Sequence, residues 1–410
     1  MRPTNIFQLS CVLLSLLALS ACEKLQVKPT PPEAPICACP VQPAPPSKTG
    51  EVKPEPVKVP DYSLLKPADW QELEAITKDD VTKAWPAWKL GCASLKVKPA
   101  WQAVCNEADK LDNPSKKEIV EYFKNNFAVY RTTNLDGSST GMITGYYEPV
   151  IKGSRTKNDK FRFPIYMRPD DLITVELASL FPELANKRVR GRVVGTKLIP
   201  YYNRGEIEAD NSPLQGREFV WVDDQIDLFF LQIQGSGMVY LDNGEKMHVG
   251  YADQNGQAYQ SIGRLLIEKG ELTADKASMQ GIKDWARSNP NKLRDLLNAN
   301  PSYVFFRELP AGLPGPIGAL GAPILAERVV AIDPRFVPLG APIFLSTNLP
   351  NSNKPLNRLM MAQDTGGAIK GGVRADFFWG AGDAAGKSAG SMKQQGKIWV
   401  LLPKDFPLPK

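Results

Sequence analysis

The feature that most limits how this chain can fold is a series of eleven prolines between residues 29 and 60. Proline fixes φ and lacks an N–H donor, so a segment this rich in proline forms neither a regular helix nor an inner strand and stays extended. We therefore expect residues 22–60 to be a spacer and the folded body to begin near Tyr62. The remaining length is sufficient for more than one domain.

A secretory leader is expected before this spacer. Residues 1–21 have a basic start, an apolar middle and small residues at the end, which is typical of a signal peptide and too short to span a bilayer. The sequence Leu19-Ser20-Ala21-Cys22 resembles the bacterial lipobox, which implies acylation of Cys22. Glu23 replaces the Asp of a usual inner-membrane retention signal, so we expect a lipid anchor in the outer membrane, facing the periplasm. The alternative is a plain signal peptide with an incidental cysteine.

The cysteines and the single histidine limit the chemistry. In an oxidising periplasm a disulfide is plausible, and Cys92 with Cys105 is the favoured pair. Cys37 and Cys39 lie in the spacer, where pairing between molecules is also open. With only His248 and no paired Cys-x-x-Cys, we expect no metal site and no cofactor.

The charge pattern argues against a nucleic-acid partner. The net charge is +6, and the charges are mixed along the chain without a long Lys/Arg run. Gly235-Ser236-Gly237 is too short for a phosphate-binding loop. At most, a mild attraction to acidic polymers or anionic lipid heads follows.

The body begins with helical patterns and then changes to strands. Ser115 and Glu118 form a capping-box pattern that predicts a helix start. Residues 141–150 are rich in strand formers and end at proline, which predicts a strand. From 151 to about 225, short extended runs such as 163–166 and 218–222 alternate with Gly and Pro, which predicts a small β-rich domain.

The second half is predicted to mix both types. Residues 226–234 form an apolar run that we interpret as a strand. Amphipathic helices are expected at about 258–269, ending at Gly270, and around Met279, ending before Pro290. From Tyr303 to Leu402, short strands alternate with turns, as in small barrels.

The strongest candidate for chemistry is the glycine-rich block from Asp364 to Gly380. It holds two carboxylates, Asp364 and Asp376, 12 residues apart. Three aromatic residues follow Asp376, and burial against them would raise the pKa of its carboxyl group and suit it to general-acid catalysis. The alternative is a glycine-rich barrel corner with ordinary surface aspartates.

Together with three further segments, this block resembles the membrane-bound lytic murein transglycosylase A family, over about residues 62–402. The three segments are Thr144-Gly145-Tyr146-Tyr147-x-Pro149-Val150, Gln234-Gly235-Ser236-Gly237 and Tyr251-Ala252-x-x-Asn255-Gly256-x-x-Tyr259-x-Ser261-Ile262-Gly263.

The resemblance implies a mainly β fold with flanking helices. In it, a double-psi β-barrel is interrupted by a second, smaller β-barrel-like domain, with a groove between them. Here the catalytic barrel would comprise residues 61–150 and 227–410, and the inserted domain residues 151–226.

The resemblance also implies the site. Asp376 falls on the family's single catalytic acid, Asp364 on a neighbouring aspartate that shapes the site, and Thr144 on a threonine beside the acid. Gln234, Gly235 and Ser236 fall on the family's groove segment, where sugar contacts are expected. From their side chains, Tyr146, Tyr147 and Trp379 suit stacking on sugar faces, with core packing as the alternative, and Lys370 suits either a polar group of the substrate or the cap of a turn.

The implied reaction is cleavage of the β-1,4 MurNAc–GlcNAc bond of peptidoglycan with formation of a 1,6-anhydromuramoyl end. Protonated Asp376 would donate to the glycosidic oxygen and then accept the proton of the sugar's own 6-hydroxyl, an internal nucleophile of high effective concentration. An ordinary glycosidase needs a second carboxylate. The expected partners are glycan strands and the outer membrane, and a cell-wall synthesis partner is left open.

Two rival functions remain at this stage. Asp364-Thr365-Gly366 matches the triplet of aspartic proteases, but no second copy occurs in the chain, so only a homodimer would complete such a site. A non-catalytic peptidoglycan-binding lipoprotein is the other, and substitution of Asp376 would separate it from an enzyme. Serine hydrolase chemistry is disfavoured because His248 has no nucleophile motif near it.

Overall fold

The computed structural model describes residues 60–181, 184 and 189–408. The predictions for the signal peptide, for Cys22 and for most of the proline-rich spacer, including Cys37 and Cys39, lie outside these residues. Within the described ranges, no helix is both long and apolar enough to cross a bilayer.

The folded body opens with helices that pack on a β-barrel. The predicted capping box is present, since Ser115 and Glu118 each accept from the other's backbone N–H at the start of the third α-helix. Cys92 and Cys105, the pair that the sequence favours, form a disulfide between the first two α-helices. The helices are the 3-10 turns Tyr62–Leu64, Trp70–Lys78 and Val81–Lys83, then α1 (Trp85–Leu95), α2 (Pro99–Asp109) and α3 (Lys116–Asn126).

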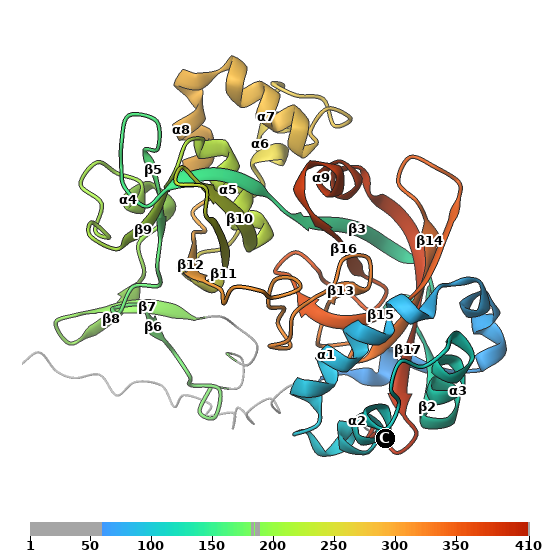
Figure 1. Ribbon diagram of the computed structural model, residues 1–410. Helices are drawn as coiled ribbons and strands as arrows, with labels where there is room; N and C mark the ends of the chain where they lie inside the picture. Colours follow the sequence, from blue (N-terminus) through green and yellow to red (C-terminus); the bar gives the residue numbers. More distant parts are fainter. Residues whose placement is uncertain (1–59, 182–183, 185–188, 409–410) are drawn as a thin grey trace, which may run out of the picture. The chain divides into compact units, whose positions relative to one another are not determined.

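Six strands close into a barrel (Figure 1). The order β17-β14-β15-β13-β16-β3 returns on itself because β17 also pairs with β3. The pairs β13–β15 and β3–β16 are parallel, and β1 and β2 continue the sheet from β17. The bounds are β1 (Leu65–Ala68), β2 (Phe127–Thr132), β3 (Gly141–Glu148), β13 (Val329–Ile332), β14 (Pro342–Asn348), β15 (Pro355–Thr365), β16 (Ala375–Ala381) and β17 (Lys393–Pro403).

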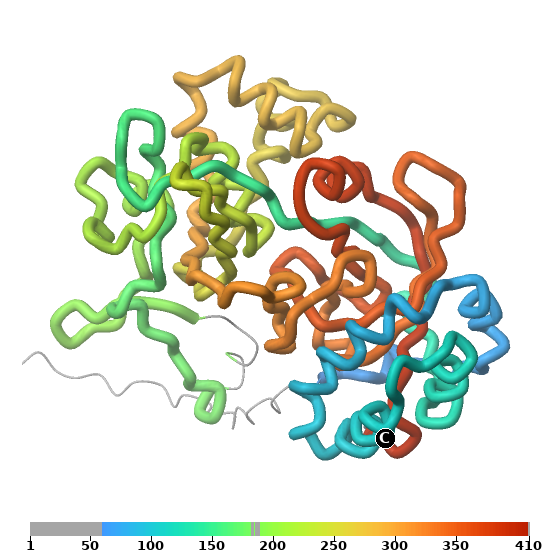
Figure 2. Tube along the Cα trace, viewed as in Figure 1, coloured from blue at the N-terminus to red at the C-terminus, as the bar shows by residue number. Residues whose placement is uncertain are grey.

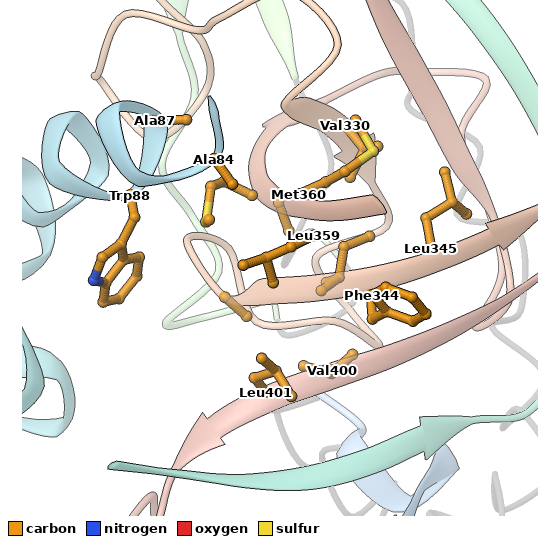
Figure 3. Close-up of a cluster of buried hydrophobic side chains, with 14 of the residues drawn as sticks. Ala84, Ala87, Trp88, Val330, Phe344, Leu345, Leu359, Met360, Val400 and Leu401 are labelled. Carbon is orange, nitrogen blue, oxygen red and sulfur yellow. The ribbon is translucent and has the colours of Figure 1, made fainter. Parts of the chain in front are cut away.

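The barrel is filled by apolar side chains. All four residues of β13 are buried, and α1 adds the fully buried Trp88 to the same core. A packed interior makes the barrel a stiff support for side chains at its surface. Figure 3 shows part of this core, with Ala84, Ala87, Trp88, Val330, Phe344, Leu345, Leu359, Met360, Val400 and Leu401 labelled.

A second sheet has six strands in the order β12-β11-β10-β4-β9-β5, and a separate sheet has three in the order β6-β7-β8. The architecture is therefore mainly β, with a closed barrel and a second β structure, as the fold-class prediction states. The bounds are β4 (Val150–Ser154), β5 (Phe163–Tyr166), β6 (Ile173–Thr174), β7 (Arg190–Val194), β8 (Lys197–Pro200), β9 (Glu218–Val222), β10 (Ser236–Leu241), β11 (Lys246–Gln254) and β12 (Val304–Glu308).

The predicted end of the inserted domain at residue 226 divides this six-stranded sheet. Strands β10, β11 and β12 all follow residue 226, and β10 pairs in parallel with β4. Half of the strands of the sheet would thus be assigned to the barrel. We therefore propose that the inserted part of the chain extends to Glu308, where β12 ends.

The strand predicted at residues 226–234 is wrong, because this run is helix α5 (Gln225–Gln234). Asp224 caps its start by accepting from the backbone N–H groups of Ile226 and Asp227, and Gly235 ends it in the left-handed conformation with φ 79°. A short apolar run buried on most sides shows little periodicity, so the two cap residues carried the distinguishing information.

The two predicted amphipathic helices are confirmed, and three further α-helices were not predicted. The short helix α4 begins at an Asn203 cap, α8 begins at Pro290 directly after α7, and α9 follows the last aromatic residues of β16. The bounds are α4 (Arg204–Ile207), α6 (Ile262–Glu268), α7 (Met279–Ser288), α8 (Pro290–Asn298) and α9 (Gly382–Ser391).

A buried ion pair ties the N-terminal segment to the barrel. Two nitrogens of Arg328 donate to the two carboxylate oxygens of Asp79 at 2.7 and 3.0 Å. Asp79 also accepts from the backbone N–H of Leu359, in β15, at 2.9 Å. Only 6% and 4% of the two side chains are exposed. Removal of either charge would leave the other buried without compensation.

We expect Asp79→Asn to lower the free energy of unfolding by about 3 kcal/mol or more, because Arg328 loses its counter-charge in a buried place. The measurement is urea unfolding at neutral pH. Lys83→Ala is the matched control, since it removes an exposed ion pair to Asp80 and should cost less than about 1 kcal/mol. Equal losses in the two variants would contradict the structural role of the buried pair.

Candidate active site

The strand register of the barrel brings the two predicted aspartates and Thr144 to one level. Asp376 of β16 pairs with Thr144 of β3 on one side and with Ala331 of β13 on the other. Ala331 pairs in turn with Asp364 of β15. Because neighbouring strands lie about 4.8 Å apart, the backbones at Asp364 and Asp376 are roughly 10 Å apart, with β13 between them.

The carboxyl group of Asp376 has the environment of a general acid. The hydroxyl of Thr144 donates to its Oδ1. Burial is the largest influence on Asp376 and raises its pKa, whereas the Thr144 hydrogen bond and the charge of Arg374 lower it and the charge of Asp364 raises it. The net effect is a pKa above the ordinary value, so this carboxyl group keeps its proton to a higher pH than a surface aspartate.

Asp364 is held by donors from three directions. Tyr146 donates its hydroxyl to Oδ2 at 2.9 Å, and the backbone N–H groups of Ala319 and Thr365 donate to Oδ1 at 3.0 and 2.9 Å. Burial and the charge of Asp364 hold the pKa of Tyr146 well above its usual range, so the phenol remains a donor. This arrangement suits a fixed acceptor that shapes the site, the role expected for Asp364.

Tyr146 therefore has a partner that the sequence did not indicate. Its ring also packs on Phe378, with ring centroids 5.1 Å apart, on the strand face that carries Asp376. The apolar wall expected beside Asp376 is thus formed in part by Phe378. Contact of Tyr146 with a sugar stays a prediction.

Arg374 is a site residue that the sequence reasoning missed. Its Nη2 donates to Oγ1 of Thr144 at 2.9 Å, and its Nη1 donates to the carbonyl oxygens of Ala375 and Met142 at 2.6 and 3.3 Å. The sequence offers one signal for it: Arg374 lies two residues before Asp376, and alternate residues of an extended chain share a face.

Tyr147 and Trp379 lie on the other face of their strands from Thr144 and Asp376. Tyr147 is buried and packs with Ala385 and Ala389 of α9. The indole N–H of Trp379 donates to the sulfur of Met392 at 3.3 Å. Packing beneath α9 accounts for both rings, so these contacts do not favour their predicted role in sugar binding.

The segment from Gln234 to Ser236 lies beside β3. The side-chain oxygen of Gln234 accepts from the backbone N–H of Tyr147 at 3.0 Å, and the half-buried Ser236 begins β10 directly after Gly235. This places the segment three residues along β3 from Thr144. Lys370, the remaining predicted contact, is exposed after the end of β15. Substrate contact by these residues stays a prediction.

The single histidine belongs to a buried pair. Nε2 of His248, in β11, lies 2.6 Å from Oε1 of Glu148 at the end of β3, with exposed side-chain fractions of 10% and 6%. His248 is therefore a link between two strands. Among the residues that the structure describes, no three His, Cys, Asp or Glu side chains are grouped to hold a metal ion.

The raised pKa of Asp376 predicts a gain in stability on its neutralisation. Below about pH 3.9, the value of an unfolded aspartate, Asp376 is neutral in both states. As the pH rises through the raised pKa of the folded state, ionisation of this partly buried carboxyl group costs free energy. We expect Asp376→Asn to have a higher free energy of unfolding than the wild type at neutral pH, and this difference to disappear at acidic pH.

Urea unfolding across a pH series measures this difference. Asp364→Asn is the control and should lose stability at neutral pH, because its carboxylate accepts from three donors. An Asp376→Asn variant that is less stable than the wild type at every pH would contradict the electrostatic description of the site.

Comparisons with known proteins show what this chain is similar to. Residues 142–307 match the family model described as the MltA specific insert domain, and residues 328–402 match the 3D domain. The chain is 33% identical over 279 residues to the membrane-bound lytic murein transglycosylase A of Escherichia coli K12, covering 66% of this chain and 68% of that relative.

Solved structures support the same relationship. The crystal structure of MltA from Neisseria gonorrhoeae, in its monoclinic form, is 40% identical with a TM-score of 0.74, covering 84% of this chain and 93% of that one. The structure of E. coli MltA with bound chitohexaose is 25% identical with a TM-score of 0.58, covering 83% and 91% of the two chains.

Proposed function

Because the chain belongs to the membrane-bound lytic murein transglycosylase A family, we propose that it cleaves the β-1,4 bond between MurNAc and GlcNAc in peptidoglycan and leaves a 1,6-anhydromuramoyl end. The observation that carries this proposal is the partly buried carboxyl group of Asp376, with its raised pKa and its hydrogen bond from Thr144. A relative with bound chitohexaose, a β-1,4-linked sugar chain, supports the class of substrate.

In the first step, Asp376 is the general acid. Its proton moves to the glycosidic oxygen while the bond from that oxygen to the anomeric carbon of MurNAc breaks, and GlcNAc leaves as an alcohol. Positive charge develops at the anomeric carbon, beside the carboxylate that has just formed. The raised pKa of Asp376 makes the proton available at a pH where an ordinary aspartate has lost it.

In the second step, the carboxylate of Asp376 is the base. The 6-hydroxyl of the same MurNAc attacks the anomeric carbon, and its proton returns to Asp376, which regenerates the acid. Since the nucleophile belongs to the substrate, its effective concentration is high and no activated water is needed. One carboxyl group therefore serves both steps.

The contacts of Asp364 support a single acid/base. A second catalytic carboxylate would have an oxygen aimed at a water or at the anomeric carbon. Both oxygens of Asp364 already accept hydrogen bonds from protein donors. Its charge acts instead on Asp376, by raising the pKa of that carboxyl group.

The same contacts disfavour the aspartic-protease alternative. In such enzymes two aspartates share one proton at close range. Here Asp364 and Asp376 are separated by β13 and bind different donors, Tyr146 and Thr144. The Asp364-Thr365-Gly366 triplet therefore lacks the geometry of a proton-sharing pair within this chain.

The proposed location is the periplasmic face of the outer membrane, through a lipid on Cys22. The lipobox-like sequence before Cys22 and the Glu at position 23 support it, as does the membrane-bound name of the relatives. The proline-rich segment would then separate the enzyme from the membrane by an extended spacer.

The decisive experiment is mass spectrometry of the products after the full-length protein digests purified peptidoglycan. We expect sugar products one water lighter than those of a hydrolase. Asp376→Asn should lower the rate by at least about 100-fold, the usual contribution of general acid–base catalysis. Asp383→Asn, an exposed aspartate at the start of α9, is the control and should retain the rate.

Other results would change the assignment. Reducing-end products would show that water is the nucleophile and that a second carboxylate takes part. Glycan binding without cleavage, unaffected by Asp376→Asn, would favour the non-catalytic lipoprotein.

A further inference from the structure

We propose that Arg374 is a positioning residue for Asp376. Its guanidinium donates to Oγ1 of Thr144, which turns the threonine hydroxyl toward Oδ1 of Asp376 and leaves Oδ2 as the oxygen that gives and takes the proton. This inference rests on the proposed function and adds to it the arrangement that fixes where the reactive proton lies.

The direction of these hydrogen bonds follows from the chemistry of the groups. A guanidinium can only donate, so the 2.9 Å contact from Arg374 uses a lone pair of Thr144. A threonine hydroxyl has one proton, and an ionised carboxylate has none, so in the base form Thr144 must donate to Asp376. Donation from Arg374 polarises the threonine O–H and favours the same orientation when Asp376 is protonated.

The guanidinium itself is held in place. Its Nη1 donates to the carbonyl oxygens of Ala375 and Met142, at 2.6 and 3.3 Å, so the side chain is fixed to both β16 and the start of β3. The side chain is half-buried, which lowers the pKa of Arg374, while the charge of Asp376 opposes that change. An arginine nevertheless stays charged at any pH used for catalysis.

The charge of Arg374 also matters for a group that must be both acid and base. The charged or titratable groups that act on Asp376 are Arg374, Asp364 and Tyr146. Burial and Asp364 favour the protonated form, which the first step needs. Thr144 and Arg374 favour the ionised form, which the second step needs. Arg374 is the cation in this set, so it should limit how far the pKa of Asp376 is raised.

The test is the pH dependence of kcat/KM for the full-length protein on purified peptidoglycan. In Arg374→Met, the alkaline limb, where Asp376 loses its proton, should move to higher pH, and the maximal kcat/KM should fall by about 10- to 100-fold. Arg374→Lys keeps the charge and should hold the limb near the wild-type position while restoring only part of the rate, because one ammonium cannot reproduce the fork of donors.

Thr144→Val tests whether Arg374 acts on Asp376 through the hydroxyl group of Thr144. In that background, the further change Arg374→Met should lower the rate much less than it does in the wild type, because the hydroxyl that Arg374 orients is absent. Because stability itself depends on pH, the folded fraction of each variant is measured at every pH, and the limb is compared after correction for that fraction.

The outcomes separate this inference from the proposed function. If Asp376→Asn is inactive but Arg374→Met keeps the wild-type limb, the role of Arg374 is overturned and the proposed function stands. The role is also overturned if Arg374→Met lowers the rate equally with and without Thr144. Full activity of Asp376→Asn would overturn the assignment of Asp376 on which both proposals depend.

Discussion

The constraint on which the rest of the structure depends is the double pairing of β3. This strand pairs with β16 on one edge and β17 on the other, and without it the six strands would be an open sheet. Figure 2 shows β3, from the first half of the chain, running beside strands from its C-terminal part. Thr144 lies 232 residues from Asp376 in sequence, so the same pairing that closes the barrel also assembles the site.

Closure of the barrel also explains why the site can hold a partly buried carboxyl group. Asp376 lies between two hydrogen-bonded strands, so its backbone is fixed and only its side chain responds to the surroundings. Burial alone would raise the pKa of such a group so far that it would be a weak acid. Thr144 and Arg374 oppose burial, and both contacts depend on β3, since Arg374 also donates to Met142 of that strand. The barrel thus sets the balance between the protonated and ionised forms of Asp376.

Local elements could be read from the sequence where a cap or a proline marked their ends. The Ser115–Glu118 capping box and the helix at Met279 are examples, and both are confirmed. The apolar run of α5 by itself predicts a strand, whereas the cap residues Asp224 and Gly235 mark the ends of a helix. The sequence does not indicate that β4 pairs with β10, because this pairing joins residues far apart in sequence and no local pattern records it.

The residues of the candidate site also differ in how well the sequence predicts them. The glycine-rich block itself points to Asp364 and Asp376, the family resemblance adds Thr144, and the strand register explains why the three belong together. The sequence does not distinguish Arg374, because one basic residue in a glycine-rich block resembles an ordinary surface charge. Tyr147 and Trp379 were selected as aromatic residues near the motif, but strand alternation turns them away from Asp376. Sequence therefore identified which strands matter better than which way each side chain points.

The place where the chain passes from the barrel to the second sheet explains the Gln234–Gly237 motif in structural terms. The chain leaves β3 at Pro149, whose carbonyl oxygen accepts from the backbone N–H of Met238 at 2.9 Å. A Cβ on Gly237 would lie 2.9 Å from that same oxygen and 2.4 Å from a methyl carbon of Leu231. Only glycine allows this approach without displacing its neighbours.

Two further contacts fix the same crossing: the Gln234 side chain accepts from Tyr147, and His248 pairs with Glu148. The Gln234–Gly237 motif therefore has a role before any sugar is considered, because it anchors the second sheet to the end of the strand that carries Thr144. A substitution there would disturb the acid through β3 as well as any direct contact with substrate. Loss of activity in such a variant would therefore not by itself show that the motif binds sugar.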